Sequence, residues 1–339
     1  MPLNFSPEFA IGGNRQTGGE YLSTMTFDEF LERVERQHPF LYAGIDVSKW
    51  RHFIDEYAHE MNAQSWEFEG NENGGRGAEY TQAQETANNR AIGMSALLRM
   101  FSAAEHEYPS GDTIILDALA GNGTVAEFAA AQEGCSCTIV SADISRLMVE
   151  DSFKKGLPCI RQSAVKSLLI DRFLDGVLLA YGTHHLTQEQ RARAVREASR
   201  TLARNGRLVL HDFEIGGPVD KWFREVVHPY SITGHPHPHF DKQQLHALFR
   251  SGGFRNIQIG EIDDPIQTSG FSREEATENM VRFIHSMYGL SKIFIEDPES
   301  RTFLRNEIFR TLGPIEVWRQ DDMFTASIMR RALVAVGSV

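Results

Sequence analysis

The feature that most constrains the fold is a regular alternation of short apolar runs with segments of helical spacing, which begins at Thr113. The apolar runs are, in order, TIILDAL, TIVSAD, PCIRQS, DGVLLAYG, GRLVLHDF and FRNIQIGEI. The segments between them, such as TVAEFAAAQEG, contain good helix formers whose apolar residues fall on one helix face. This alternation predicts an α/β fold with a parallel sheet that is covered on both faces. A ligand is then expected beyond the carboxyl ends of the strands.

The chain on either side of this alternation is predicted to be helical. Residues 1–105 form a helical cap region, and residues 106–339 form the catalytic domain. Within that domain a helical insertion at about 268–318 is followed by a final strand, RRALVAVG. We therefore expect one sheet with a cap before it and an insertion near its end, rather than two domains of equal size.

Several helices have boundaries that the sequence indicates. Thr26 and Glu29 form a capping box at the start of one helix. A helix that begins at Thr187 is predicted to stop at Asn205-Gly206. The segment ANNRAIGMSALLRMFSAAE is predicted to be one long helix with Ile92 among its buried residues.

Charge and composition exclude several classes of partner. The chain has 34 Lys and Arg against 46 Asp and Glu, which gives a formal net charge of −12 and repels a phosphate backbone. No apolar run approaches the ~18 residues that a membrane span requires, and the first thirty residues lack a secretory signal. Cys135, Cys137 and Cys159 lack paired CxxC spacing, which is typical of a reducing compartment. We expect a cytoplasmic protein with a small-molecule substrate, no nucleic acid and no membrane partner.

The stretch TIILDALAGNGTVAEF has the features of an adenosine-cofactor site. Its strand ends at Asp117, and Ala120, Gly121 and Gly123 permit a tight turn before the next helix. The second strand ends at Asp143, whose carboxylate can accept both hydroxyls of a ribose. The same glycines match the dinucleotide-binding fingerprint, so a nicotinamide-dependent oxidoreductase stays an alternative. Asp117 favours S-adenosylmethionine, because a pyrophosphate would be repelled by this acid whereas an ammonium and a sulfonium tolerate it.

Five motifs in order resemble those of the class I S-adenosylmethionine-dependent methyltransferases, over roughly Ile114 to Phe254 and the last strand. LDALAGNG is similar to their first motif, RQSAV to the third and DGVLLAYGTHHL to the fourth. The resemblance implies a Rossmann-like seven-stranded sheet. Leu119 stands where the family has its first glycine and Ser163 where it has an acid, so a non-catalytic dimerisation protein with this fold stays an alternative. The cofactor-binding residues that the resemblance implies are Asp117, Ala120, Gly121, Gly123, Asp143, Ile144, Ser163, Ala164 and Tyr181.

Two groups of histidines flank the expected cleft. His184 and His185 follow the fourth strand, and His235, His237 and His239 alternate in the loop before a later helix. The prolines that follow His235 and His237 favour extended backbone, in which alternate side chains share one face. Together with a carboxylate, neutral imidazoles suit Zn or Fe. The predicted metal ligands are His185, His237 and His239, with His235 as a substitute, and the predicted catalytic residues are His184, His185 and Asp212.

A metal ion at this position suits one kind of methyl acceptor. Methylation of carbon beside a carbonyl requires loss of a proton, and a Lewis acid can bind the oxo and carboxylate oxygens of a 2-oxo acid. The histidine placement resembles bacterial 2-oxo-acid C-methyltransferases that act on aryl pyruvates or 2-ketoarginine, which implies a role in specialised metabolism. Arg76 or Arg90 is expected to clamp the carboxylate, and His184 is a candidate base. The residues expected to enclose the acceptor are Trp50, Tyr57, Tyr80, Phe283 and Tyr288.

Two further questions stay open at this point. A metal-independent O- or N-methyltransferase of a small natural product would use His184 or His185 as a base. A homodimer formed through the N-terminal helices is compatible with the sequence.

Overall fold

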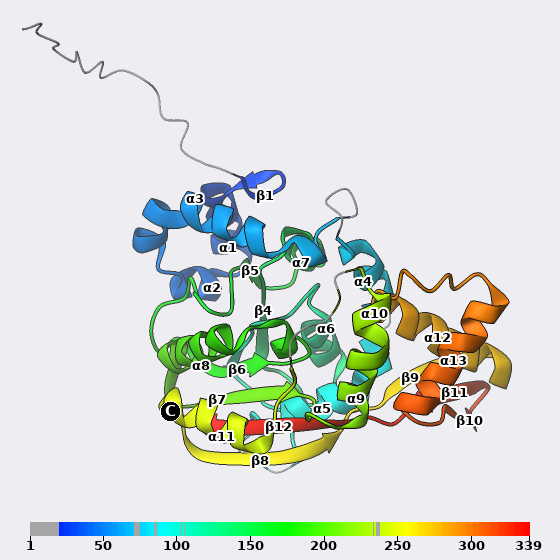
Figure 1. Ribbon diagram of the computed structural model, residues 1–339. Helices are drawn as coiled ribbons and strands as arrows, with labels where there is room; N and C mark the ends of the chain where they lie inside the picture. Colours follow the sequence, from blue (N-terminus) through cyan, green and yellow to red (C-terminus); the bar gives the residue numbers. More distant parts are fainter. Residues whose placement is uncertain are drawn as a thin grey trace, which may run out of the picture.

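A twisted, seven-stranded sheet forms the centre of the molecule in the computed structural model, which describes residues 20–70, 75–84, 87–102, 104, 106–232, 234 and 238–339 (Figure 1). Its strand order is β5-β4-β3-β6-β7-β12-β8, and the only antiparallel pairs within this sheet are those that β12 makes with β7 and β8. This arrangement confirms the predicted α/β class. The strands are β3 (Ile114–Asp117), β4 (Thr138–Asp143), β5 (Cys159–Arg161), β6 (Leu174–Leu179), β7 (Leu202–Asp212), β8 (Arg255–Asp263) and β12 (Arg331–Ser338).

Neighbouring residues of each strand point to opposite sides of the sheet, and in the central strands both sides are buried. Leu116 and Val177 pack with the N-terminal helices and with α8 and α11 in one hydrophobic cluster. Ile115 and Leu178 pack with α5 and α6 in another. These covering helices are α5 (Ala91–Arg99), α6 (Thr124–Ala131), α7 (Arg146–Lys154), α8 (Gln188–Thr201) and α11 (Lys242–Ser251).

Two helix boundaries differ from those predicted. The helix that begins after Thr187 ends at Thr201 rather than at Asn205-Gly206, because Leu202 turns extended and pairs with Leu174 of β6. The long helix predicted at residues 87–105 is instead a short 3-10 turn (Ala87–Arg90) followed by α5, which stops at Arg99. Ile92, predicted to be buried, is 45% exposed.

The N-terminal region is mainly helical, as expected, and it begins with a small hairpin that the sequence did not indicate. Its first helix starts at the predicted capping box, in which Thr26 and Glu29 each accept a backbone hydrogen bond from the other. The elements are β1 (Glu20–Leu22), β2 (Met25–Thr26), α1 (Phe27–Gln37), α2 (Pro39–Gly44), α3 (Val47–Gln64), a 3-10 turn (Trp66–Phe68) and α4 (Gly77–Gln84).

The insertion between β8 and β12 contains strands as well as helices, which corrects the purely helical prediction. Its strands form a second, antiparallel sheet in the order β10-β11-β9, against which α12 packs. In Figure 1 this orange part lies on a different side of the main sheet from the blue N-terminal helices. Its elements are β9 (Ile266–Gly270), α12 (Arg273–Met287), α13 (Pro298–Thr311), β10 (Glu316–Gln320) and β11 (Met323–Ile328).

A short helical segment between β7 and α11 joins the insertion to the sheet. It consists of α9 (Pro218–Trp222), a π-helical turn (Phe223–Val227) and α10 (His228–Tyr230). Its apolar residues share a hydrophobic cluster with those of α12 and α13. None of the helices in the described residues is long and apolar enough to cross a membrane.

The turn after β3 gives a first prediction. Gly123 caps α6 with a φ of 86°, and a Cβ there would lie 2.5 Å from Leu157 Cδ1 and 3.1 Å from Ser152 Oγ. Gly123→Ala should therefore lower the free energy of unfolding by ~2–5 kcal/mol, through left-handed strain of ~1–2 kcal/mol and overpacking of ~1–3 kcal/mol. Urea unfolding measures this loss.

The matched control is Gly134→Ala. Gly134 has a similar φ of 81°, but a Cβ there has nothing within 4 Å. This variant should lose only the strain component, ~1–2 kcal/mol. Equal losses in the two variants would contradict the packing account of the turn.

Candidate functional site

A cavity of about 380 Å³ lies at the carboxyl ends of the strands, between the N-terminal region and the insertion. It is lined by residues from three parts of the chain. The turns after β3, β4, β5 and β6 form its floor, Phe68 and Tyr80 come from the N-terminal region, and Tyr288 and Arg330 come from the insertion side. This is where the parallel-sheet prediction placed the ligand site.

The side of the cavity nearest β3 and β4 contains most of the predicted cofactor residues. Asp143 holds the turn after β3 in place, because its Oδ2 accepts a hydrogen bond from the Gly121 amide at 2.9 Å. Its Oδ1 accepts another from the Ser145 amide at 2.9 Å. Burial raises the pKa of Asp143, although these backbone donors oppose the shift. The predicted cofactor residues that line this side are Gly121, Asp143, Ile144, Ser163 and Ala164.

Three predicted cofactor residues lie just behind the cavity lining. Asp117 is 2% exposed, and burial raises its pKa to about 7. The Ala120 amide donates to Ala142 O at 2.9 Å, which ties the turn to β4. Gly123 begins α6. These residues shape the turn, and the residues that face the cavity are their neighbours.

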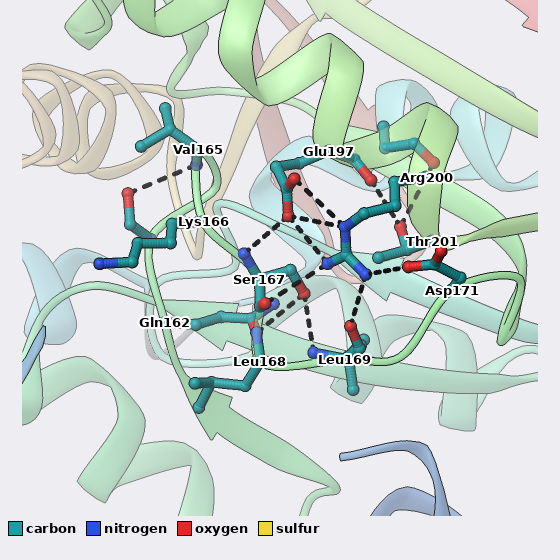
Figure 2. Close-up of polar contacts among 12 residues, drawn as sticks. Gln162, Val165, Lys166, Ser167, Leu168, Leu169, Asp171, Glu197, Arg200 and Thr201 are labelled. Atoms are coloured by element: carbon teal, nitrogen blue, oxygen red, sulfur yellow. Dashed lines mark hydrogen bonds and ion pairs between the residues drawn. The ribbon is translucent and has the colours of Figure 1, made fainter. Parts of the chain in front are cut away.

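The loop that carries Ser163 and Ala164 is held by two helices: the Ser163 amide donates to the Tyr57 hydroxyl of α3 at 2.7 Å, and the later residues of the loop bond to α8. Glu197 Oε2 accepts a hydrogen bond from the Ser167 amide at 3.0 Å, and the Arg200 guanidinium donates to Leu169 O at 2.9 Å (Figure 2). Arg200 and Glu197 also form an ion pair of 2.9 Å between them. Helix α8 therefore holds the later part of the loop that follows β5.

Histidines and a carboxylate meet on the opposite side of the cavity. His184 Nδ1 lies 3.1 Å from Asp212 Oδ1, and the rings of His184 and His239 are 5.5 Å apart. All three residues are buried, and their potential ligand atoms lie within 4.8 Å of one another. Burial by itself would raise the pKa of Asp212, but the charge and hydrogen bond of His184 hold it well below its usual value. Asp212 is therefore a carboxylate at neutral pH.

His185 lines the cavity, and among the residues that the structure describes it is not a member of this cluster. Its Nδ1 lies 3.6 Å from Glu67 Oε2, and its ring is 4.6 Å from that of His184. Within the described residues, His184 thus occupies the position beside His239 that the sequence analysis gave to His185. His235 and His237, the other predicted metal residues, lie outside the described residues.

Tyr181 lines the cavity away from the predicted ribose acid. Its hydroxyl donates to Asp264 Oδ1 at 3.2 Å, and its backbone φ is 58°. Its ring is 4.4 Å from that of His211 and 4.3 Å from the Arg90 guanidinium carbon. Tyr181 therefore lines the cavity and contacts a buried group of charged residues, and its role at the cofactor stays a prediction.

The residues expected to enclose the acceptor divide into two groups. Tyr80 and Tyr288 line the cavity, whereas Trp50, Tyr57 and Phe283 pack in hydrophobic clusters. Helical spacing identifies a buried face but does not show whether that face meets a cavity or the core.

Both arginines proposed as carboxylate clamps line the cavity. Arg76 forms a 3.0 Å ion pair with Glu67 and donates to Met287 O of α12 at 3.1 Å, so it links the N-terminal region to the insertion. Arg90 lies over Tyr181. Glu67 and Arg330 also line the cavity and were not predicted from the sequence. Only the position of Arg330 directly before the last strand is a signal for it.

Comparison with known proteins gives the family. Residues 116–210 match the model of a family described as a methyltransferase domain. The ubiquinone/menaquinone biosynthesis C-methyltransferase UbiE of Geotalea uraniireducens (strain Rf4) is 30% identical over 208 residues, which cover 52% of this chain and 85% of that protein. Among solved structures, the YcgJ protein of Bacillus subtilis is 16% identical with a TM-score of 0.48, over 73% of this chain and 97% of that chain.

A second solved structure is phosphoethanolamine N-methyltransferase 2 of Haemonchus contortus, in complex with phosphomonomethylethanolamine and S-adenosylhomocysteine. It is 16% identical with a TM-score of 0.45, over 72% of this chain and 52% of that chain.

The family match includes the parts of the chain that form the cavity floor. Residues 116–210 contain Asp117, Gly121, Asp143 and His184. The match favours S-adenosylmethionine over a nicotinamide dinucleotide as the cofactor, and a small molecule as the acceptor. With 85% of a relative covered at 30% identity, the chain belongs to the class I S-adenosylmethionine-dependent methyltransferases.

Proposed function

We propose that the enzyme methylates the carbon beside the oxo group of a 2-oxo acid, with a metal ion held by His184, Asp212 and His239. The observation that carries this proposal is the burial of these three residues around one point, with ligand atoms within 4.8 Å of one another. His184 also lines the cavity. A metal ion in this cluster would therefore lie beside the acceptor.

The chemistry of the cluster suits zinc or iron. Two imidazoles and a carboxylate are a ligand set that both metals accept. Burial lowers the pKa of His239, which favours the neutral imidazole that a metal ion requires. His239 Nδ1 lies 2.9 Å from Asp220 Oδ1, so Nε2 is the nitrogen that can act as a ligand. A carboxylate behind a ligand histidine commonly fixes the ring at metal sites.

The chain's own residues would align the acceptor and remove its proton. When bound, the metal ion supplies Lewis acidity that polarises the oxo oxygen and acidifies the neighbouring carbon. We assign the proton acceptor to His185, which lines the cavity beside Glu67. The carbon then attacks the methyl group in line with the carbon–sulfur bond, whose electron pair leaves with the sulfur of S-adenosylhomocysteine.

One observation favours a second candidate function. His184 and Asp212 are in direct hydrogen-bonding contact at 3.1 Å, an arrangement that orients a general base. A metal-independent O- or N-methyltransferase would use His184 to deprotonate a hydroxyl or an amine. Metal content and activity together separate the two candidates.

The cofactor assignment gives a second prediction. Asp143→Ala should weaken binding of S-adenosylmethionine by about 10- to 100-fold, because hydrogen bonds to a charged group contribute ~1.5–3 kcal/mol and ~1.4 kcal/mol is tenfold. Isothermal titration calorimetry measures the dissociation constant. Asp112→Ala, which removes an exposed acid from the loop before β3, should bind normally. Unchanged binding by the Asp143 variant would refute the ribose assignment.

The metal assignment gives a third prediction. Elemental analysis of the purified enzyme should find about one zinc or iron per chain, which fits one cluster of three ligands. In D2O with S-adenosylhomocysteine bound, the enzyme should exchange the protons beside the oxo group of phenylpyruvate, as followed by proton NMR. His239→Ala should lose both the metal and the exchange, and a chelator should abolish the exchange.

His246→Ala is the matched control, because His246 is exposed on α11 and outside the cluster. It should retain the metal and the exchange. A metal-free enzyme with full methyl-transfer activity toward a hydroxyl or amine would instead support the second candidate.

A further inference from the structure

A buried pair of opposite charges lies at the points where the insertion leaves and rejoins the main sheet. Asp264 directly follows β8, and Arg330 directly precedes β12. Asp264 is 0% exposed and Arg330 is 4% exposed. The Asp264 amide donates to Arg330 O at 2.9 Å, so the backbones of the two connections are also bonded to each other.

The Arg330 guanidinium is held from one side. Its Nε donates to Asp264 O at 3.0 Å and its Nη2 to Asp264 Oδ2 at 2.6 Å, while its Nη1 donates to the Tyr288 hydroxyl at 3.2 Å. A guanidinium has about five N–H donors, so these three bonds leave two. Arg330 lines the cavity whereas Asp264 does not. The acid therefore orients the guanidinium and leaves donors for a molecule in the cavity.

A second cation lies on the same side. Arg90 is 7% exposed, lines the cavity and lies over the Tyr181 ring, whose hydroxyl donates to Asp264. Asp264 compensates one of the two guanidinium charges. Asp117 is a further acid that acts on Arg90, and burial raises its pKa to about 7. Two guanidinium groups therefore line this side of the cavity.

An aromatic ring lies beside the Arg330 guanidinium. The Arg330 guanidinium carbon lies 5.1 Å from the Phe213 ring centroid. The Phe213 ring is in turn 6.1 Å from that of His239. Charge interactions strengthen away from water, and a planar guanidinium matches a carboxylate with two parallel hydrogen bonds. The arrangement suits a small organic anion that reaches from Arg330 toward His239.

We infer that Arg330 is the receptor for the carboxylate of the methyl acceptor, with Asp264 and Tyr288 as its positioning residues and Arg90 as the second cation. The inference rests on the proposed function, in which the acceptor is a 2-oxo acid. It also gives the insertion a role in specificity, because both connections to the insertion hold the receptor arginine.

The test compares an acid with its uncharged ester. Isothermal titration calorimetry of the enzyme loaded with S-adenosylhomocysteine measures binding of phenylpyruvate and of its methyl ester. The wild type should prefer the acid. Arg330→Gln should weaken binding of the acid by about 10- to 100-fold, the range for hydrogen bonds to a charged group, and leave binding of the ester unchanged. Arg330→Lys should bind the acid more weakly than the wild type and more tightly than Arg330→Gln, because lysine keeps the charge but loses the paired donors.

A double variant that removes both buried charges separates loss of binding from loss of folding. Arg330→Gln alone leaves Asp264 buried without its cation, which is strongly destabilising, whereas Arg330→Gln with Asp264→Asn removes both charges. This double variant should bind S-adenosylhomocysteine normally and lose the preference for the acid. Arg319→Gln, an exposed change on β10 of the same insertion, should behave as wild type.

Two outcomes would overturn the inference: a wild type with no preference for the acid, or Arg330 variants that keep the wild-type preference. The proposed function fails separately. A wild type that binds the acid through Arg330 but methylates no 2-oxo acid would keep Arg330 as a carboxylate receptor and refute the proposed reaction. An Arg330 variant that methylates the acid with unchanged KM would support the reaction and refute the role of Arg330.

Discussion

The parallel pairing of β4, β3, β6 and β7 is the constraint on which the rest of the site depends. Because these strands run in the same direction, their carboxyl ends meet at one edge of the sheet. Gly121, Asp143, His184 and Asp212 each follow or end a different strand. The first three line one cavity, and Asp212 contacts His184 beside it. The helices on both faces bury the sheet and hold that edge rigid.

The cavity separates charge by side. Acids surround the part assigned to the cofactor, where Asp143 binds the backbone of the turn after β3 and Asp117 lies buried behind it. Arginines line the part next to the insertion. A cationic methyl donor and an anionic acceptor would therefore each meet the opposite charge, and their reacting atoms would face each other between the two sides.

The sequence predicted the sheet and its turns well, because their signals are local. An apolar strand that ends in Asp117 and is followed by closely spaced glycines is typical of a strand, a tight turn and a helix in a parallel sheet. The strands of the insertion were missed, because they are short and partly polar, and they become strands only by pairing with one another. The boundary at Thr201 was misplaced for the same reason, since pairing of Leu202 with β6 ended the helix. His184 and His185 are neighbours in one 3-10 turn, and sequence spacing cannot show which of them meets His239. Arg330 and Asp264 are 66 residues apart, so only the antiparallel pairing of β8 with β12 reveals them as a pair.

The central claim is that the enzyme transfers a methyl group to the carbon beside the oxo group of a 2-oxo acid bound in this cavity. The most direct measurement is incubation of the enzyme with S-adenosylmethionine carrying an isotopically labelled methyl group and with a 2-oxo acid such as phenylpyruvate, followed by NMR of the product. The account predicts a label bonded to the carbon next to the oxo group, and loss of this product when His239 is replaced by Ala. A label found on oxygen or nitrogen of the acceptor, or full product formation by the His239 variant, would contradict it.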